Sequence, residues 1–263
     1  MPNIELKTPE LMELLEGKFT LIELKERIPM IGVDMERIDD EKIIVEIFPN
    51  RPDLVSVEGF ARALKGFLGV ETGLVEYKVH DSNVSVTADS SVNKIRPYIA
   101  CAVVKNVKFT EDFLVSLMNL QEKLHVTHGR NRKKVAIGVH DFDKITSPFT
   151  YKTVKPGEIK FTPLDSQEKM DLNEILLKHP KGTAYTHIFN GITDYPVILD
   201  KNGSVVSFPP IINGELTRVT ENTKNLFIEI TGTDESAVNQ ALNIVVSAIA
   251  DRGGDVYGVE VKR

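Results

Sequence analysis

The chain has 263 residues, of which 41% are hydrophobic and 27% charged, and its formal net charge is −6. This length suggests one or two domains with enough chain to bury a core, and no apolar run approaches the span of a membrane helix. The first residues, MPNIELKTPE, are polar and acidic, which is not the pattern of a secretory signal peptide. The single cysteine, Cys101, sits in the apolar run IACAVV and has no partner for an internal disulfide, so we expect a cytoplasmic protein.

The N-terminal part of the chain is predicted to begin with two short helices. In Thr8-Pro9-Glu10 a hydroxyl cap precedes a proline in the first turn, and Gly17 is the expected end of that helix. Thr20 and Glu23 have the spacing of a capping box, which predicts a second helix that stops before Pro29.

A strand and an amphipathic helix complete this first unit. Isoleucine and valine alternate from 42 to 48, and apolar residues recur at helical spacing from 56 to 68. The stiff turn between them contains Arg51 and Asp53. These two residues could bind a partner, but a turn of this kind more often holds a strand against the following helix. Polar residues near position 85 predict a domain boundary there.

The second unit is predicted to mix strands and helices. Strands are expected at 84–88, 98–104, 135–139, 196–199 and 204–208. Helices are expected at 112–124, at 172–177 and after Thr233 or Asp234. The fold class is therefore α+β, with a small N-terminal α/β domain over 1–85 and a larger mixed-sheet domain with packed helices over 86–254. A last strand within 255–263 is predicted to return to the first domain.

The stretch from Ser207 to Asp234 is the most informative part of the sequence. Pro209-Pro210 is followed by Asn213-Gly214, a dipeptide that favours turns. The run from 225 to 231 alternates as a strand, with Leu226, Ile228 and Ile230 on one face. Glu229 points to the other face beside Phe227 and Thr231. A carboxylate there costs free energy if it is buried without a partner, whereas an ordinary solvated face would also explain it.

The segment from 123 to 134, KLHVTHGRNRKK, is strongly basic and contains no acidic residue. Its cationic residues are Lys123, Arg130, Arg132, Lys133 and Lys134. Such a segment is either a solvated loop or a surface that contacts phosphates. His125 and His128 have the spacing of a metal-binding pair, but no thiolate or third ligand stands nearby, so no metal site is expected.

Four motifs carry a resemblance to a known family. They are PPIIN, T-x-N-T-x-N-x-FIE-x-TGTD (220–234), FPNRPDLxSVEGxARAL (48–64) and KVAIGVHDFDKI (134–145). Together they resemble the N-terminal portion, with the editing domain, of the β subunit of archaeal and eukaryotic phenylalanyl-tRNA synthetases. The full subunit of that family is much longer, and nothing here resembles its C-terminal half or the class II catalytic subunit.

The resemblance implies proofreading hydrolysis of tyrosine that is mis-attached to the tRNA for phenylalanine. It implies that this tRNA and the synthetase α subunit, in an α2β2 assembly, are the partners. It also implies that the editing fragment uses no cofactor, while the whole enzyme uses ATP and Mg²⁺ for aminoacylation. With a tRNA substrate, the basic segment is expected to contact phosphates.

Hydrolysis of such an ester needs groups that place a water molecule and the ester carbonyl. Asn213, Ser207 and the backbone amides around Gly214 are candidates, and so is His140, for which a purely structural role at the strand end is equally open. Glu229 falls at the place of the tyrosine-selecting glutamate of the family. The remaining substrate contacts are expected from Phe227, Thr231, Asp234, Pro210, Gly214 and Leu199. For Asp234 the alternative role is the cap of the last helix.

Other chemistries find little support in the sequence. It has no Walker loop, no G-x-G-x-x-G after a strand, no HExxH and no G-x-S-x-G elbow, and its only thiol is in an apolar strand. Two alternatives to an esterase stay open. One is a non-catalytic RNA-binding module that uses only the basic segment, and the other is a scaffold for the α subunit that uses the turn with Arg51 and Asp53.

Overall fold

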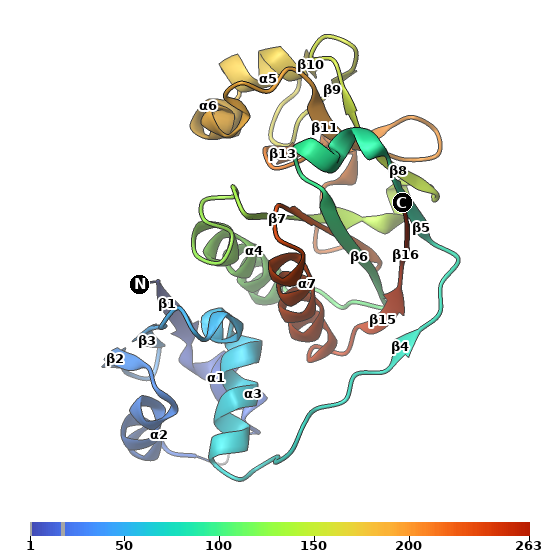
Figure 1. Cartoon of the computed structure of the whole chain (residues 1–263). Helices are drawn as coiled ribbons and strands as arrows, with labels where there is room; N and C mark the ends of the chain where they lie inside the picture. Colours follow the sequence, from blue (N-terminus) through green and yellow to red (C-terminus); the bar gives the residue numbers. More distant parts are fainter. Residues whose placement is uncertain (1, 17–18) are drawn as a thin grey trace.

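The computed structural model describes residues 2–16 and 19–263, whose elements form a small N-terminal unit and a larger two-sheet body (Figure 1). The N-terminal unit is an antiparallel sheet in the order β1-β3-β2 with three helices packed on it. Its elements are β1 (Asn3–Lys7), α1 (Thr8–Leu14), α2 (Leu21–Arg27), β2 (Asp34–Ile38), β3 (Lys42–Glu46) and α3 (Val57–Phe67). Gly17, the predicted end of the first helix, lies outside the described residues.

Local sequence signals set the start of α2 and the turn before α3. The predicted Thr8 cap of α1 is wrong, because Lys7 takes the cap position and the Thr8 hydroxyl donates to the Asp39 carbonyl. The Thr20 side chain accepts a hydrogen bond from the Glu23 amide, and the Glu23 carboxylate accepts one from the Thr20 amide, which confirms the capping box. Arg51 donates to both carboxylate oxygens of Asp53, at 2.9 and 2.7 Å. A Cβ atom on Gly59 would lie 1.9 Å from the Asp53 carbonyl oxygen, so this turn packs directly against α3. The contacts favour the structural reading of Arg51 and Asp53.

Two sheets stacked face to face form the larger body. The five-stranded sheet has the order β4 (Val79–His80), β15 (Asp255–Gly258), β6 (Tyr98–Lys105), β14 (Leu226–Gly232) and β7 (Val135–Asp141). The six-stranded sheet has the order β13 (Ile212–Asn213), β12 (Val205–Phe208), β11 (Tyr195–Leu199), β8 (Phe149–Val154), β5 (Ser85–Ala88) and β16 (Glu260–Lys262). The predicted α+β class is confirmed.

Helices cover the outer faces of this body. The long helices α4 (Glu111–Val126) and α7 (Glu235–Ala250) pack on the five-stranded sheet (Figure 1). The opposite side carries α5 (Leu172–Lys178), α6 (Pro180–Tyr185), β9 (Lys160–Phe161) and β10 (Met170–Asp171). The sequence predicted α4, α5 and α7 but not α6.

The central strand β14 alternates between two cores, as its sequence predicts. Leu226, Ile228 and Ile230 are buried with residues of α4 and α7, whereas Phe227 is buried between the two sheets. Glu229 shares the face of Phe227 because side chains two residues apart point the same way. It lies opposite Cys101 of β6 and Gly138 of β7, and only 3% of its surface is exposed.

The N-terminal unit shares its core with α4 and α7. A single set of contacting buried side chains runs from β1 and α3 into these two helices. Ion pairs span the same boundary: Arg62 contacts Asp251 at 2.6 Å, and Arg252 contacts Glu58 at 2.8 Å and also Glu10. The sheet of the N-terminal unit is thereby fixed to the helical face of the larger body.

The end of the chain agrees with the prediction only in part. Residues 255–262 form two strands rather than one, β15 and β16, one in each sheet of the larger body. β15 pairs with β6 and, in parallel, with β4, which precedes the predicted boundary at residue 85. β16 pairs in parallel with β5. Neither strand joins β1, β2 or β3.

Two further outcomes concern the six-stranded sheet. The predicted turn between β11 and β12 is confirmed, with the Asp200 carboxylate accepting from the Asn202 and Ser204 amides and Gly203 at φ 79°. Strand β8, which pairs with β11 on one side and β5 on the other, was not predicted from the sequence. In the described part of the chain, no helix is both long and apolar enough to cross a bilayer.

Candidate functional site

Polar side chains gather between the two sheets, where most neighbours are apolar. We call Gly138, His140, Ser207, Thr217 and Glu229 the intersheet cluster. Its members come from β7, β12, β14 and the segment after β13, and each of the four side chains is at most 3% exposed. Because buried polar groups are costly without partners, the hydrogen bonds of this cluster decide what it can bind.

Glu229 has one partnered and one unpartnered carboxylate oxygen. The Ser207 hydroxyl donates to Oε1 over 2.9 Å. Oε2 is buried and has no hydrogen-bond partner among the described residues. The carboxylate therefore still requires a donor.

His140 presents a second unpartnered atom beside this carboxylate. Its Nδ1 lies 2.8 Å from the hydroxyl oxygen of Thr217, whose only proton is donated to the Gly214 carbonyl at 3.1 Å. Nδ1 must then carry the proton, which leaves a lone pair on Nε2 in the neutral ring. Nε2 has no partner and lies 3.8 Å from Oε1 of Glu229. Two acceptors thus lie near each other, and a hydroxyl that enters the cluster could donate its one proton to either of them.

Gly138 makes this approach sterically feasible. A Cβ atom at this position would lie 2.4 Å from Oε1 of Glu229 and 2.6 Å from Nε2 of His140. Any larger residue would displace one of the two side chains. The glycine in the AIGVHD strand is therefore a site residue that the sequence reading did not single out.

Arg96 is a second residue that the sequence did not reveal. It is 2% exposed and donates to the side chain and carbonyl of Thr231, at 3.2 and 2.6 Å, and to the carbonyls of Arg132 and Lys133. Burial lowers the pKa of its guanidinium. Thr231 lies on the face of Glu229, but its hydroxyl is engaged by Arg96. No local pattern marks a single arginine as buried, so only the fold identifies it.

The aromatic and loop residues of the predicted site lie around the cluster. Phe227 stacks on Phe149 at 4.4 Å and has its ring 6.1 Å from that of His140. Leu199 is partly buried at the end of β11, against the core beneath α5. The Pro210 carbonyl faces Arg132 at 3.4 Å. The Gly214 amide donates to Val206 at 2.9 Å, so it is not free to stabilise an oxyanion as predicted.

A cleft opens on the other side of β7. We call it the α4–β7 cleft; it has a volume of about 410 Å³ and lies between α4, the edge of β7 and residues 211–219. Asn213 lines it and donates from Nδ2 to the Val139 carbonyl at 3.3 Å. Thr217 lines it as well and contacts His140 behind it. Thr217 is therefore shared by the cleft and the intersheet cluster.

Asp234 is separate from this site. Its carboxylate accepts from the Ala237 amide at 2.8 Å and pairs with Lys134 at 3.3 Å. The Ala237 amide and the Lys134 ammonium lower the pKa of Asp234. Of its two predicted roles, the structure supports the cap of α7.

The basic segment divides into buried and exposed residues. Arg132 is only 8% exposed; it pairs with Glu122 at 2.6 Å, lies over the Tyr185 ring and lines the α4–β7 cleft. This position does not fit the predicted solvated surface. Arg130 and Lys133 are exposed, and Lys134 is half-buried. A phosphate-contacting role stays a prediction for these three residues.

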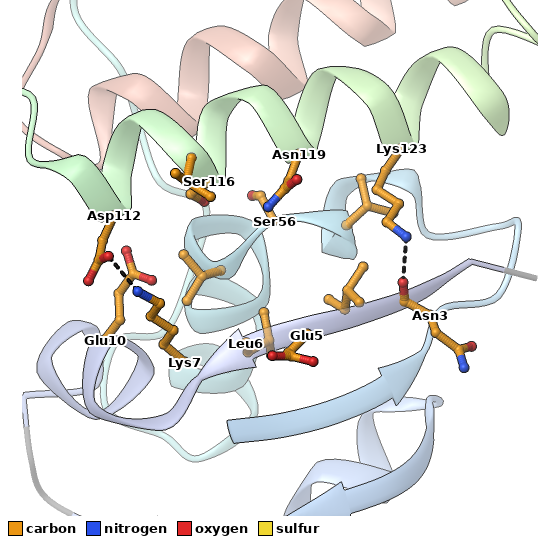
Figure 2. A pocket seen from close by; sticks show the side chains of 14 residues that line it. Asn3, Glu5, Leu6, Lys7, Glu10, Ser56, Asp112, Ser116, Asn119 and Lys123 are labelled. Carbon is orange, nitrogen blue, oxygen red and sulfur yellow. Dashed lines mark hydrogen bonds and ion pairs between the residues drawn. The ribbon is translucent and has the colours of Figure 1, made fainter. Parts of the chain in front are cut away.

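Lys123 lies elsewhere, in a groove of about 400 Å³ between β1 and α4 (Figure 2). Its ammonium donates to the Asn3 carbonyl at 2.7 Å, at one end of this groove, and a pair between Lys7 and Asp112 spans the other end (Figure 2). Lys123 is thus bound to the N-terminal unit and is not part of the exposed basic surface that contains Arg130 and Lys133.

Each of the two histidines of the basic segment forms a hydrogen bond through its Nε2 within the fold. His125 Nε2 accepts from the Ile137 amide at 2.8 Å, and His128 Nε2 donates to the Ala237 carbonyl at 2.8 Å. Within residues 2–16 and 19–263, no three potential ligands come together as a metal site would require.

The comparisons with known proteins agree with the resemblance seen in the sequence. The family model of the B3/4 domain matches residues 95–259. Two relatives named phenylalanine–tRNA ligase β subunit, from Methanosarcina barkeri and Archaeoglobus fulgidus, are 53% and 49% identical over 264 and 261 residues. These matches cover 100% and 99% of the chain but 48% and 47% of the relatives, so the chain spans about half their length.

A solved structure has the same fold. The crystal structure of an N-terminal fragment of the phenylalanyl-tRNA synthetase β subunit from Pyrococcus horikoshii is 41% identical and superposes with a TM-score of 0.93. The match covers 99% of this chain and 76% of that fragment. The chain therefore belongs to the phenylalanyl-tRNA synthetase β-subunit family and contains its B3/4 domain.

Proposed function

We propose that this chain hydrolyses the ester of tyrosine mis-attached to the tRNA for phenylalanine, as the proofreading part of a phenylalanine–tRNA ligase. The observation that carries the proposal is the pair of buried, unpartnered acceptors in the intersheet cluster, Oε2 of Glu229 and Nε2 of His140. A phenol hydroxyl would donate its one proton to one of these two atoms, and phenylalanine lacks this donor.

A proofreading site is needed because the aminoacylation pocket of the ligase separates tyrosine from phenylalanine poorly. A pocket made for phenylalanine rejects one added hydroxyl only weakly, by roughly a hundredfold. A second pocket that binds the hydroxyl reverses the preference, because phenylalanine would leave buried acceptors unpaired. Sites of this kind discriminate by about 10⁴ to 10⁵.

The hydrolysis needs few catalytic groups from the protein. Water attacks the ester carbonyl carbon, the bond from that carbon to the ribose oxygen breaks, and the ribose oxygen takes up a proton. Positioning of the water and hydrogen bonds to the developing oxyanion supply much of the acceleration. Asn213 is our candidate for the oxyanion contact, because its carboxamide has a second proton besides the one donated to Val139.

The other groups position the substrate. Ser207 holds Glu229 through its 2.9 Å hydrogen bond, and Thr217 fixes the tautomer of His140. Phe227 and Phe149 provide an apolar wall for the aromatic ring. This hydrolysis requires no cofactor; ATP and Mg²⁺ serve aminoacylation, which we assign to the whole ligase with its α subunit.

The test is to mix the chain with Tyr-tRNA and Phe-tRNA, both made on the tRNA for phenylalanine, and to follow release of each amino acid. We expect tyrosine to be released and phenylalanine to be spared. Binding of tRNA that weakens with salt, without any release of tyrosine, would instead identify an RNA-binding module.

A further inference from the structure

Strand β1 is an edge strand with one unpaired side. The sheet of the N-terminal unit has the order β1-β3-β2, so β1 has a neighbouring strand on one side only. The Pro2 carbonyl and the Thr8 amide, at the two ends of β1, form 3.0 Å hydrogen bonds with residues that flank β3. Bonded and non-bonded residues alternate in an antiparallel pair. The backbone groups of Asn3, Glu5 and Lys7 therefore point away from β3.

These backbone groups face the groove between β1 and α4, which we call the β1–α4 groove (Figure 2). The Asn3 carbonyl accepts from the Lys123 ammonium at 2.7 Å, and Lys7 is the cap residue of α1. The N–H and C=O of Glu5, midway along the strand, have no backbone partner among the described residues. An open strand edge inside a groove is the arrangement to which an extended peptide adds through backbone hydrogen bonds.

The β1–α4 groove has room for such a strand. Its volume is about 400 Å³, and cavities of about 310 and 620 Å³ continue it past Lys7 and past Asn3. Successive side chains of an added strand point to opposite faces of the sheet. Val55, Val57 and Val115 line the groove, so they can pack against every second side chain of that strand.

Two side-chain contacts cross the ends of the groove (Figure 2). In the pair between Lys7 and Asp112 both side chains are more than half exposed, and exposed pairs stabilise a fold little. Lys123 donates to the Asn3 carbonyl, as an amide of an added strand would. Both contacts can therefore be replaced by a bound strand.

The charges around β1 favour a basic segment. Past Asn3, the carboxylates beside Lys123 are those of Glu36, Glu46 and Glu122. Past Lys7, the carboxylates beside Lys7 and Lys42 are those of Glu5, Glu10, Glu41 and Asp112. Carboxylates outnumber ammonium groups at both ends of the groove, so a positively charged partner is complementary to it.

We propose that a basic, extended segment of a partner protein binds in the β1–α4 groove and adds to β1 as a fourth strand. Its backbone pairs with Glu5, its apolar side chains pack on Val55 and Val57, and its cationic side chains pair with the surrounding carboxylates. The inference does not depend on the proposed hydrolysis, because the residues of α4 that line this groove are not those that line the α4–β7 cleft.

The probe is an octapeptide that alternates lysine with valine and has blocked ends, titrated into the whole chain by calorimetry. The same peptide with glutamate in place of lysine should bind at least about tenfold more weakly. N-methylation of every second amide tests the backbone pairing, because alternate amides of an added strand point toward its neighbour. Methylation of one alternate set should abolish binding, and methylation of the other set should preserve it.

Variants of the protein test the same contacts from the other side. Glu5→Pro removes the open N–H without removing a hydrogen bond to β3, and proline is tolerated on edge strands. It should abolish binding, whereas Glu5→Ala keeps the N–H and should weaken binding only in part. Asn119→Trp should also abolish binding, because Asn119 points across the groove toward Ser56 (Figure 2). Met118→Trp is the matched control, since Met118 is the next residue and is also exposed but lines the α4–β7 cleft.

Each outcome decides for or against the inference. Equal binding of the lysine and glutamate peptides would overturn it, as would equal effects of the two methylated sets or of the two tryptophan variants. Dimerisation of the chain that Asn119→Trp abolishes would make a second copy the occupant and would overturn it as well. If urea unfolding shows that Glu5→Pro is not folded, the methylated peptides still decide the matter. Binding that requires lysine, one alternate set of amides and an unfilled groove supports the inference, whether or not Tyr-tRNA is hydrolysed.

Discussion

Nε2 of His140 lies 3.8 Å from Oε1 of Glu229 on the neighbouring strand, with a glycine beneath both side chains. Because Thr217 fixes the proton of His140 on Nδ1, Nε2 of His140 and Oε1 of Glu229 are both acceptors. Their close approach is unfavourable unless a proton lies between them. The proposed selection for a hydroxyl rests on this geometry.

Replacing Glu229 by alanine should reduce the preference for Tyr-tRNA over Phe-tRNA. Loss of a hydrogen bond to a charged acceptor corresponds to roughly 2–3 kcal/mol, or about 30- to 160-fold in the ratio of the two rates. The measurement is kcat/KM for release of each amino acid. Glu221→Ala is the control, because Glu221 is an exposed turn residue and its loss should change neither rate. A Glu229→Ala chain with full discrimination would refute the role of this carboxylate.

Gly138→Ala should abolish hydrolysis and lower stability. The added methyl group would overlap Glu229 and His140, and forced displacement in a packed interior costs about 1–3 kcal/mol. Release of tyrosine and the midpoint of urea unfolding measure the two effects. Gly157→Ala is the matched control, since no heavy atom lies within 4 Å of a Cβ there. Equal behaviour of the two variants would mean that the close approach of the two side chains is unimportant.

His125 should make the protein lose stability in mild acid. Burial is the main cause that lowers the pKa of His125 from 6.5 to about 4. Between these values the unfolded chain binds a proton that the folded chain excludes, so the free energy of unfolding falls as the pH falls. The shift corresponds to about 3 kcal/mol between pH 7 and pH 4.

Glu122 affects the free energy of unfolding in a different pH range. The neighbouring His125 ring and the Arg132 and Lys181 cations lower its pKa, so its contribution to stability is lost only below about pH 4.5. Urea unfolding at several pH values between 4.5 and 6.5 therefore isolates His125. The slope should flatten in His125→Gln and persist in His187→Gln, since His187 is exposed. An unchanged slope in His125→Gln would show that other groups cause the pH dependence.

Arg96→Ala should destabilise the fold severely. The change leaves the side chain and carbonyl of Thr231 and two further carbonyls without their donor, at a cost of at least about 3 kcal/mol. Urea unfolding measures the effect. Arg27→Ala, on the exposed face of α2, should stay within about 0.5 kcal/mol of the parent chain. A small effect for Arg96→Ala would mean that solvent replaces the lost donor.

Local patterns predicted much of the fold and the face of β14 on which Glu229 lies. The alternation in 225–231, the capping box of Thr20 and Glu23 and the turn before Gly203 depend on neighbours in sequence, and the structure contains all of them. The partners of Glu229 depend on distant residues. Ser207 precedes it by 22 positions, and His140 and Thr217 are 77 positions apart, so their meeting follows from the stacking of the two sheets.

The wrong predictions for β8 and Arg132 also concern features that local sequence patterns do not determine. β8 carries lysine and threonines among its apolar residues and resembles a surface segment, yet it is paired on both sides in the sheet. Arg132 was grouped with its basic neighbours, but three consecutive residues with positive φ, from 130 to 132, turn it back into the protein. Neither outcome can be deduced from charge or hydropathy.

The pairing of β15 and β16 has a consequence for synthesis on the ribosome. Each strand covers a sheet edge laid down by residues that emerge far earlier, β6 in one sheet and β5 in the other. Both edges stay open until the residues up to 262 have left the exit tunnel. Exposed strand edges are sites of association between chains. The nascent protein is therefore most vulnerable to self-association just before its two sheets close together.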